Sequence, residues 1–345
     1  MLNSRKIKIL EAIVNDYIAS AEPIGSRTIA KKYGLGISSA TIRNEMSDLE
    51  EMGYIIASHA SSGRAPSDKG YRLYVDEFMQ KKRLKPEQKK LLINATTNKL
   101  NQIDLMLKDI AQAICHITNY TTIVADQPQS HKIKHIQIVP IDSATLALML
   151  ITDLKAIKNH IVFLQNSDEI SFNTAAKISA ELSRLLAGAS INDLTELFIG
   201  LIKHRFNEIN ISHTIVRPLI EAIRALLQAA DNIKIHTFGV KNILDFPEFS
   251  DAAKARVIVG ILEEPEDLKK LLSNEGGQIK VLIGKENEDA MLKDCSIIKA
   301  NMRISGHLSC NIAIIGPTRM DYSQVMSVFG TILEGMAEAS GANSP

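Results

Sequence analysis

Three short helical patterns separated by tight turns occupy the first 53 residues, and this spacing leaves the N-terminal part few possible folds. Apolar residues at helical spacing predict a first helix over residues 4–20, with Ser4 as its cap. Ser26 is expected to cap a short second helix that ends at Gly34, and a third helix ends at Gly53. Helices of these lengths, joined by a tight turn, predict a helix-turn-helix.

The third predicted helix has an apolar side and a polar side. At about 100° per residue, Ile42, Met46 and Leu49 fall together and are expected to face the core. The opposite side carries residue types suited to a major groove, because arginine pairs with guanine, asparagine with adenine, and hydroxyls with bases or phosphates. Serines lie at the start of this helix, where the free backbone amides and the helix dipole favour binding of a phosphate. The predicted DNA-binding residues of this segment are Ser38, Ser39, Ala40, Thr41, Arg43, Asn44 and Ser47.

The alternative interpretation is that Arg43 and Asn44 form an ordinary solvated face. Acidic residues gather in the C-terminal half of the same helix, where contact with phosphate would be repulsive. We therefore expect the N-terminal half to enter the groove, as recognition helices do.

Residues 54–74 predict a β-ribbon followed by a helix capped near Ser67. A ribbon directly after a recognition helix is a wing, and its small Ser/Gly tip permits close approach to the DNA backbone. We expect His59, Ser62 and Arg64 to contact DNA, with Arg64 mainly holding phosphate. The alternative for His59 is a hydrogen-bonded turn residue.

The remaining chain predicts an α+β multidomain protein in which a helical block interrupts an α/β pattern. A winged helix-turn-helix domain is expected at 1–83, and an α/β domain at 84–165 and 236–345, with 84–120 as one long connecting helix. The apolar stripe along that helix fits either a coiled coil or packing on a domain, and we favour packing. The block at 166–235 has three strongly apolar helical patterns and is expected to form an inserted, mainly helical unit.

Three segments resemble one family closely. They are ATIRNEMSDLEEMGYI followed by SGRAPSDKGYRLYVD, FGVKNILDFPEF at 238–249, and IGPTRMDYSQVM at 315–326. These collinear segments are similar to the heat-inducible transcription repressor HrcA family, and the resemblance covers essentially the whole chain. It implies a winged helix, a GAF-like domain formed by the split α/β pattern, and an inserted dimerising domain at 166–235.

The resemblance also implies the function. Members repress chaperone operons by binding an inverted repeat called CIRCE in double-stranded DNA, as homodimers whose activity the GroE chaperonin maintains. One alternative is a winged-helix regulator controlled by a small-molecule ligand of the GAF-like domain. Another, of a different class, is an enzyme that uses the α/β domain.

The sequence contains little that indicates an enzyme, a metal site or a membrane span. No phosphate-binding glycine loop, serine elbow or HExxH motif occurs, so we expect no enzyme activity and no cofactor. His131 and His135 are four residues apart but lie at a predicted strand, so no metal site is expected. Arg319 and Asp321 fit a structural corner better than a ligand site. The three cysteines are far apart, and no apolar run reaches the ~20 residues that span a bilayer, so a cytoplasmic protein is expected.

Overall fold

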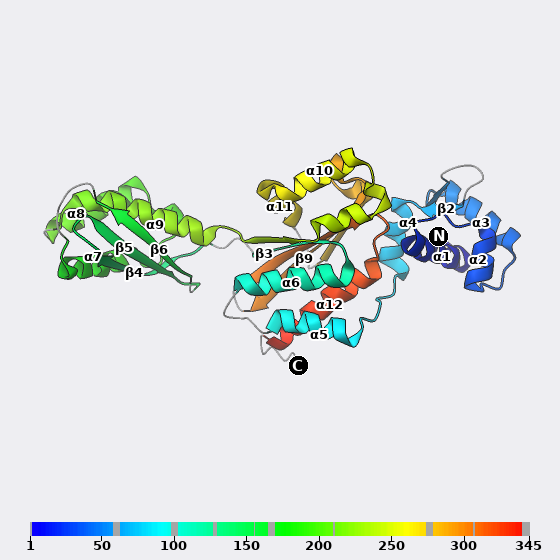
Figure 1. Cartoon of the computed structure of the whole chain (residues 1–345), viewed down its shortest axis with the longest axis horizontal. Helices are drawn as coiled ribbons and strands as arrows, with labels where there is room; N and C mark the ends of the chain where they lie inside the picture. Colours follow the sequence, from blue (N-terminus) through cyan, green and yellow to red (C-terminus); the bar gives the residue numbers. More distant parts are fainter. Residues whose placement is uncertain are drawn as a thin grey trace. The chain divides into compact units, whose positions relative to one another are not determined.

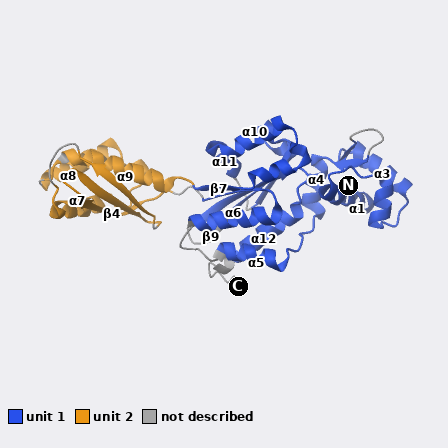
Figure 2. Cartoon of the chain, viewed as in Figure 1, with its two compact units in different colours: residues 1–126, 234–345 blue, residues 127–233 orange. Residues whose placement is uncertain are grey.

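The computed structural model describes residues 2–57, 63–97, 103–126, 130–154, 156–164, 170–209, 211–273, 279–305 and 308–339. The chain forms two compact units, one of residues 1–126 and 234–345, the other of residues 127–233 (Figure 2). Its class is α+β, with an N-terminal helical region followed by mixed α/β structure (Figure 1). No helix in the described ranges is both long and apolar enough to cross a membrane.

The N-terminal helical region follows the predicted order closely. It consists of α1 (Ser4–Ser20), α2 (Ser26–Tyr33), α3 (Ser39–Glu51), β1 (Ile55–Ala57), β2 (Arg64–Pro66), α4 (Asp68–Leu73) and a π-helical turn (Tyr74–Phe78). The caps differ from expectation by one residue: Asn3, not Ser4, accepts the capping hydrogen bond of α1, and Gly25 precedes α2 without a side-chain cap. Gly34 ends α2 in the left-handed conformation, as predicted.

The single helix predicted over 84–120 is wrong, because two helices occupy this segment. They are α5 (Pro86–Thr97) and α6 (Ile103–Thr118), which pack against each other. The predicted packing of the apolar stripe is confirmed for its described side chains, since Leu107, Ile110 and Ile114 are fully buried in the core of their own unit. A coiled-coil seam would need this surface to be free.

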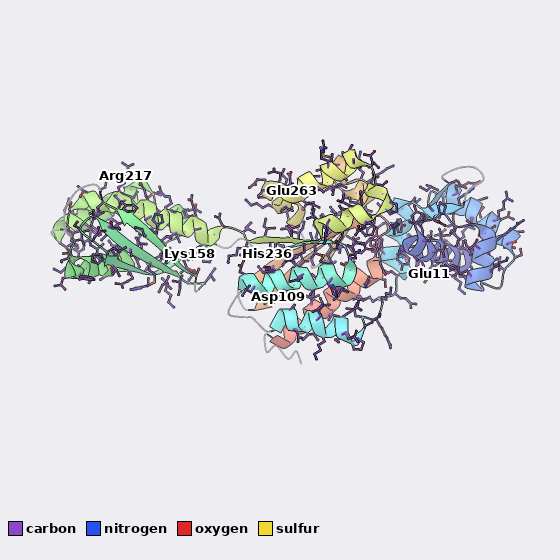
Figure 3. The ribbon with its side chains drawn as sticks, viewed as in Figure 1. Glu11, Asp109, Lys158, Arg217, His236 and Glu263 are labelled. Carbon is purple, nitrogen blue, oxygen red and sulfur yellow. The ribbon has the colours of Figure 1, made fainter. Side chains whose placement is uncertain are left out.

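A five-stranded antiparallel sheet organises the C-terminal part of the first unit, in the order β7-β3-β10-β9-β8. Its strands are β3 (Thr121–Asp126), β7 (Ile235–Phe238), β8 (Ile279–Ile283), β9 (Cys295–Ser305) and β10 (Leu308–Pro317). Helices α5, α6 and α12 (Tyr322–Ala339) lie on one side, and α10 (Ala252–Glu263) and α11 (Pro265–Leu272) on the other (Figure 1). Asp109 of α6 and Glu263 of α10 mark these two sides in Figure 3. Short 3₁₀ helices connect the elements at Val240–Asp245, Pro247–Phe249, Gly284–Glu286 and Ala290–Leu292.

The second unit combines a three-stranded antiparallel sheet with helices. Its order is β4-β5-β6, formed by β4 (Ile133–Pro140), β5 (Thr145–Thr152) and β6 (Ile157–Phe163). The helices are α7 (Phe172–Leu185), α8 (Glu196–Glu208) and α9 (Val216–Asp231), with 3₁₀ turns at Ile191–Asp193 and His213–Ile215. Alternate residues of β5 are buried in the same cluster as the inner faces of α7 and α9.

This unit corrects the predicted boundary. Residues 133–163 were expected in the α/β domain and the insertion was expected to begin at residue 166, whereas the compact unit spans 127–233. The physical reason is the shared core: Leu148 of β5 packs in one cluster with Leu182 and Leu219 of the helices. The insertion therefore contains a three-stranded sheet in addition to the helices that were predicted for it.

Candidate nucleic-acid interface

Helix α3 shows the predicted division into two sides. Ile42 and Leu49 are fully buried and Met46 is nearly so, as predicted for the core side. Arg43, Asn44 and Ser47 are exposed. The buried residues fix the rotation of the helix about its axis, so the polar residues lie together on its accessible side.

The start of α3 is ordered by its own hydroxyls. The Ser38 Oγ accepts a hydrogen bond from the Thr41 amide at 3.1 Å and lies 2.9 Å from the Thr41 Oγ1. Ser38 and Ala40 are exposed, while Ser39 and Thr41 are half-buried. Ser38 therefore serves as the N-cap, and this cap sets the direction in which the first turn of α3 presents its backbone amides.

Ion pairs neutralise most of the acidic C-terminal half of α3. The Lys6 ammonium of α1 lies 2.7 Å from the Glu45 carboxylate and 2.8 Å from the Asp48 carboxylate. Hydrogen bonds to Asp48 and then Glu45 raise the pKa of Lys6 above its ordinary value. Glu50 binds the Arg64 guanidinium at 2.8 Å. These internal cations lower the negative potential that would otherwise oppose a DNA phosphate.

The ribbon is anchored where it meets the helices. β1 and β2 pair antiparallel, and Arg64 exchanges two backbone hydrogen bonds with Ile24, at 2.9 and 3.0 Å. Gly63 passes so close to Pro23 that a Cβ there would lie 2.4 Å from the Pro23 carbonyl oxygen. Glycine is therefore required at this position for the ribbon to sit against the turn before α2.

The structure places Arg64 differently from the sequence prediction. Arg64 begins β2, and its side chain turns back to Glu50 of α3. Its phosphate-holding role was predicted from a position at the wing tip, which the residue does not occupy. His59 and Ser62 lie outside the described residues.

Helix α2 carries two cations that the sequence analysis did not select. Arg27 and Lys31 are exposed, and neither forms an ion pair with any residue in the described ranges. Lys32, beside them, is bound to Asp16. The first helix of a helix-turn-helix crosses the DNA backbone, so free cations on it are candidate phosphate ligands. The signal available in the sequence was the density of basic residues in SRTIAKKY.

Helix α4 joins the helical region to the five-stranded sheet. Arg72 binds both carboxylate oxygens of Glu286, at 2.9 and 2.5 Å, and donates to the Val281 carbonyl oxygen at 2.7 Å. The Asp68 carboxylate accepts a hydrogen bond from the Lys285 amide at 3.1 Å. The same carboxylate occupies the space in which a Cβ on Gly284, at φ +54°, would lie. This close fit connects the element after the ribbon to the edge of the sheet.

A second contact involves the motif at 315–326. Arg319 binds Glu248 at 2.5 Å, and its guanidinium donates to the Ile18 carbonyl oxygen of α1 at 3.4 Å and lies 5.5 Å from the centre of the Phe246 ring. The Asp321 amide donates to the Tyr120 hydroxyl at 2.8 Å. Arg319 and Asp321 thus act as a structural corner, which agrees with the interpretation favoured above. The motif at 238–249 supplies two of the partners of Arg319, Glu248 and Phe246.

Other candidate groups are occupied by local partners. The His131 Nδ1 lies 3.0 Å from the Asp231 carboxylate, and the His135 Nδ1 lies 3.3 Å from the Ser183 hydroxyl. Among the described residues, no group of three or more His, Cys, Asp or Glu side chains is placed to hold a metal ion. Cys295 and Cys310 are buried free thiols, and burial raises the pKa of each to about 12.

Comparisons with known proteins identify the family. Residues 104–326 match the model described as HrcA protein C terminal domain. Heat-inducible transcription repressors HrcA are 37% identical in Ruminiclostridium cellulolyticum, over 95% of this chain and 94% of the relative, and 39% identical in Clostridium botulinum strain Alaska E43, over 96% of both. The repressor of Thermoanaerobacter sp. strain X514 is 40% identical over 94% of this chain and 93% of its own length.

A solved structure supports the fold. The crystal structure of a hypothetical protein superposes with a TM-score of 0.65 at 21% sequence identity, and the match covers 100% of both chains. With relatives of 37–40% identity along almost its whole length, the chain belongs to the HrcA family of heat-inducible transcription repressors, which are DNA-binding regulators and not enzymes.

Proposed function

We propose that the N-terminal helical region is a winged helix that reads an inverted-repeat operator of the CIRCE type through α3. The observation that carries this proposal is the exposed Arg43, Asn44 and Ser47 side of a helix whose opposite side is buried. The ion pairs of Lys6 with Glu45 and Asp48 support it, because they lower the repulsion between the rest of α3 and a phosphate. Arg43 and Asn44 contact bases, and Arg27 and Lys31 contact phosphates.

In this proposal Arg64 does not contact DNA directly but holds the ribbon in place through contacts with other residues of the protein. Its contact with Glu50 holds the ribbon against α3, and its backbone bonds with Ile24 hold the ribbon against the turn before α2. We therefore assign Arg64 a positioning role that orients the wing. The five-stranded sheet with helices on both sides is the GAF-like domain, which supports the winged helix through Arg72 and Arg319.

The unit of residues 127–233 mediates dimerisation. Among the helical leucines of the predicted block that were expected to provide the contact, Leu182, Leu219 and Leu227 have no exposed surface, whereas Leu197 is 80% exposed. The outer face of the three-stranded sheet remains free, because α7 and α9 cover only its other side. Its exposed apolar side chains are Val139, Met149, Ile157, Ile161 and Phe163.

The strand register gathers these side chains into one surface. Ala147 of β5 is directly opposite both Val139 and Ile161, and Thr145 is opposite Phe163, so they share one side of the sheet. Phe163 is 72% exposed and Ile161 51% exposed. Contiguous apolar surface on a soluble unit marks an interaction site, and a second copy of the chain is the occupant that an inverted repeat requires.

The repressor also depends on the GroE chaperonin in the cytoplasm. Heat removes the active fold, and the chaperonin restores it, so that misfolded clients reduce operator occupancy by competing for the chaperonin. The relatives are heat-inducible repressors, and this heat dependence supports the proposal. Operator binding by partly inactivated protein should recover when chaperonin and ATP are added together. Operator binding that recovers without chaperonin and ATP, or that does not recover when both are present, would argue against this step.

Operator binding tests the proposed recognition. We expect Arg43→Ala to weaken operator binding by about 1–3 kcal/mol and to relax discrimination at one base pair in each half-site. Arg27→Ala serves as the matched control, because loss of a phosphate contact weakens operator and random DNA alike and reduces the salt dependence. Equal losses on operator and random DNA for Arg43→Ala would exclude base reading by this residue.

A further inference from the structure

The first unit contains a cavity beside its five-stranded sheet that the proposed function does not use. The cavity has a volume of about 460 Å³ and lies between the strands β8 and β9 and the helices α10 and α11. This size falls in the lower part of the range of small-molecule sites. The aliphatic part of its wall is formed by Ile261, Leu271, Leu282, Leu292 and Ile297.

Two lysines face each other in the wall of this cavity. Lys280 of β8 and Lys299 of β9 are direct register partners in the antiparallel pair. Side chains at such positions have Cβ atoms about 4.5–5.5 Å apart, and like charges there are destabilising. Ala313 of β10, the partner of Lys299 on its other side, is too small to shield it. A sheet keeps such a pair only at a cost in stability.

Lys299 is also nearly buried. Lys299 is 9% exposed, and its ammonium donates a hydrogen bond to the Ser273 carbonyl oxygen at 3.2 Å. No carboxylate in the described part of the chain lies within 4 Å of the Lys299 or Lys280 ammonium. An ammonium has three donors, and a buried cation without a close counter-ion is unfavourable. Burial, and then Lys280, lower the pKa of Lys299 below its ordinary value.

Four carboxylates line the cavity, and three of them have partners other than Lys280 and Lys299; the partner of Asp267, Lys270, also lies in the cavity wall. Asp267 binds Lys270 at 2.8 Å, Glu286 binds Arg72, and Asp289 accepts the Met291 amide at 2.9 Å. Glu288 acts on Lys299 only from a distance, raising its pKa slightly against the effect of burial. The cavity thus offers two ammonium groups at one place and aliphatic walls at another.

We propose that this cavity binds a small organic anion, whose carboxylate or phosphate lies between Lys280 and Lys299 and whose apolar body contacts the aliphatic wall. The anion neutralises both ammonium groups and supplies acceptors for the donors that Lys299 leaves unused. The aliphatic lining favours an anion with a hydrocarbon part over an inorganic ion. This inference concerns binding alone and does not depend on the proposed operator.

A titration of the full-length protein with sodium hexanoate, followed by ligand-observed NMR at constant ionic strength, tests the proposal. We expect saturable binding at one site per chain. Lys299→Gln and Lys280→Gln should each raise the dissociation constant at least tenfold. Lys293→Gln is the matched control, since this exposed lysine lies near the sheet but not in the cavity wall, and it should leave binding unchanged.

The exposed position of Lys280 keeps the test valid if Lys299→Gln fails to fold. Inorganic phosphate serves as the second probe. Displacement of hexanoate by phosphate would support a subsite that recognises charge, and binding of hexanoate without displacement would support recognition that also requires the apolar body. Absence of saturable binding by both probes, or binding that survives removal of either lysine, would overturn the proposal.

Discussion

The two sheets of this protein differ in how completely their faces are covered. The five-stranded sheet has helices on both sides, and on β10 Ile312, Ile314 and Ile315 are almost wholly buried. The three-stranded sheet has helices on one side only. Its inner residues, such as Leu148, are fully buried, whereas Ile161 and Phe163 on the outer side are mostly exposed.

This difference separates a sheet whose two faces are both covered within the chain from one whose outer face is covered by no helix in the described part of its own unit. An antiparallel sheet can tolerate one solvated face when that face is polar. Here the outer face of the three-stranded sheet carries exposed apolar side chains on all three strands, although Gln137 and Asn159 lie on the same side. Burial of such residues stabilises by about 25 cal/mol per Å² of apolar surface, and this stabilisation is available only through a partner.

The largest effect should come from placing charge on the outer face. We expect Ile161→Asp together with Phe163→Asp to give a folded monomer, since both side chains are largely exposed within the chain. Joining two binding modules raises affinity by roughly 10²–10⁴, so the monomer should lose that factor, or about 2.7–5.5 kcal/mol, on the full operator. Analytical ultracentrifugation and operator titration measure the two results.

The matched control places the same charges on another exposed apolar site of the unit. Leu197 and Leu201 of α8 are 80% and 60% exposed. If Leu197→Asp with Leu201→Asp dissociates the dimer while the strand variant remains dimeric, the contact lies on α8 and the incomplete sheet is not its cause.

The next largest effect is a difference in unfolding free energy between alanine substitutions in the two sheets. Ile314→Ala removes a fully buried side chain from the five-stranded sheet and should cost about 2–5 kcal/mol of unfolding free energy. Ile161→Ala should change it by less than about 0.5 kcal/mol at concentrations where the protein is monomeric, and by more where it is dimeric. Denaturant unfolding at two protein concentrations measures both. An equal, concentration-independent cost at Ile161 would show that its face is buried within the chain.

A smaller effect should come from the corner that fixes the helical region to the covered sheet. Arg319→Ala leaves the part-buried Glu248 carboxylate without its partner and frees the Ile18 carbonyl, at a cost of about 1–3 kcal/mol. Arg217→Ala is the control in the second unit, where Figure 3 labels Arg217. Both side chains of its ion pair with Glu221 are exposed, so the pair contributes at most ~0.5 kcal/mol. Hydrogen exchange of α1 amides should increase only in the Arg319 variant.

The smallest effect concerns pH. Burial alone would raise the pKa of Glu286, but hydrogen bonds from Arg72 and the Ile283 amide bring it below its ordinary value of 4.5. Because the folded-state pKa is lowered, the ionised carboxylate stabilises the fold at neutral pH, and this stabilisation is lost as pH falls through the lowered value. The difference in unfolding free energy between the wild type and Glu286→Gln should therefore shrink below pH 4.5. A difference that is constant down to pH 3 would exclude this linkage.

Hydrophobic periodicity along the chain predicted the helices that bury one face against the rest of their own unit. The buried triad of Ile42, Met46 and Leu49 and the inserted helices α7 and α9 were found this way. Strand β9 was missed, because Lys299 and Asn301 interrupt its apolar pattern although its other side is buried. The long helix over 84–120 was predicted as continuous because periodicity alone does not record where two helices separate.

The sequence by itself determined the family, the helix-turn-helix and the polar side of α3, because these depend on residues close together in the chain. Only the tertiary structure decided where the inserted unit begins, since its strands and helices share a core that no local pattern reveals. It also decided that Arg64 binds Glu50 and that Lys280 faces Lys299. Such pairings follow from strand register and from contacts between distant segments, and these are fixed by burial of the whole core and not by spacing along the chain.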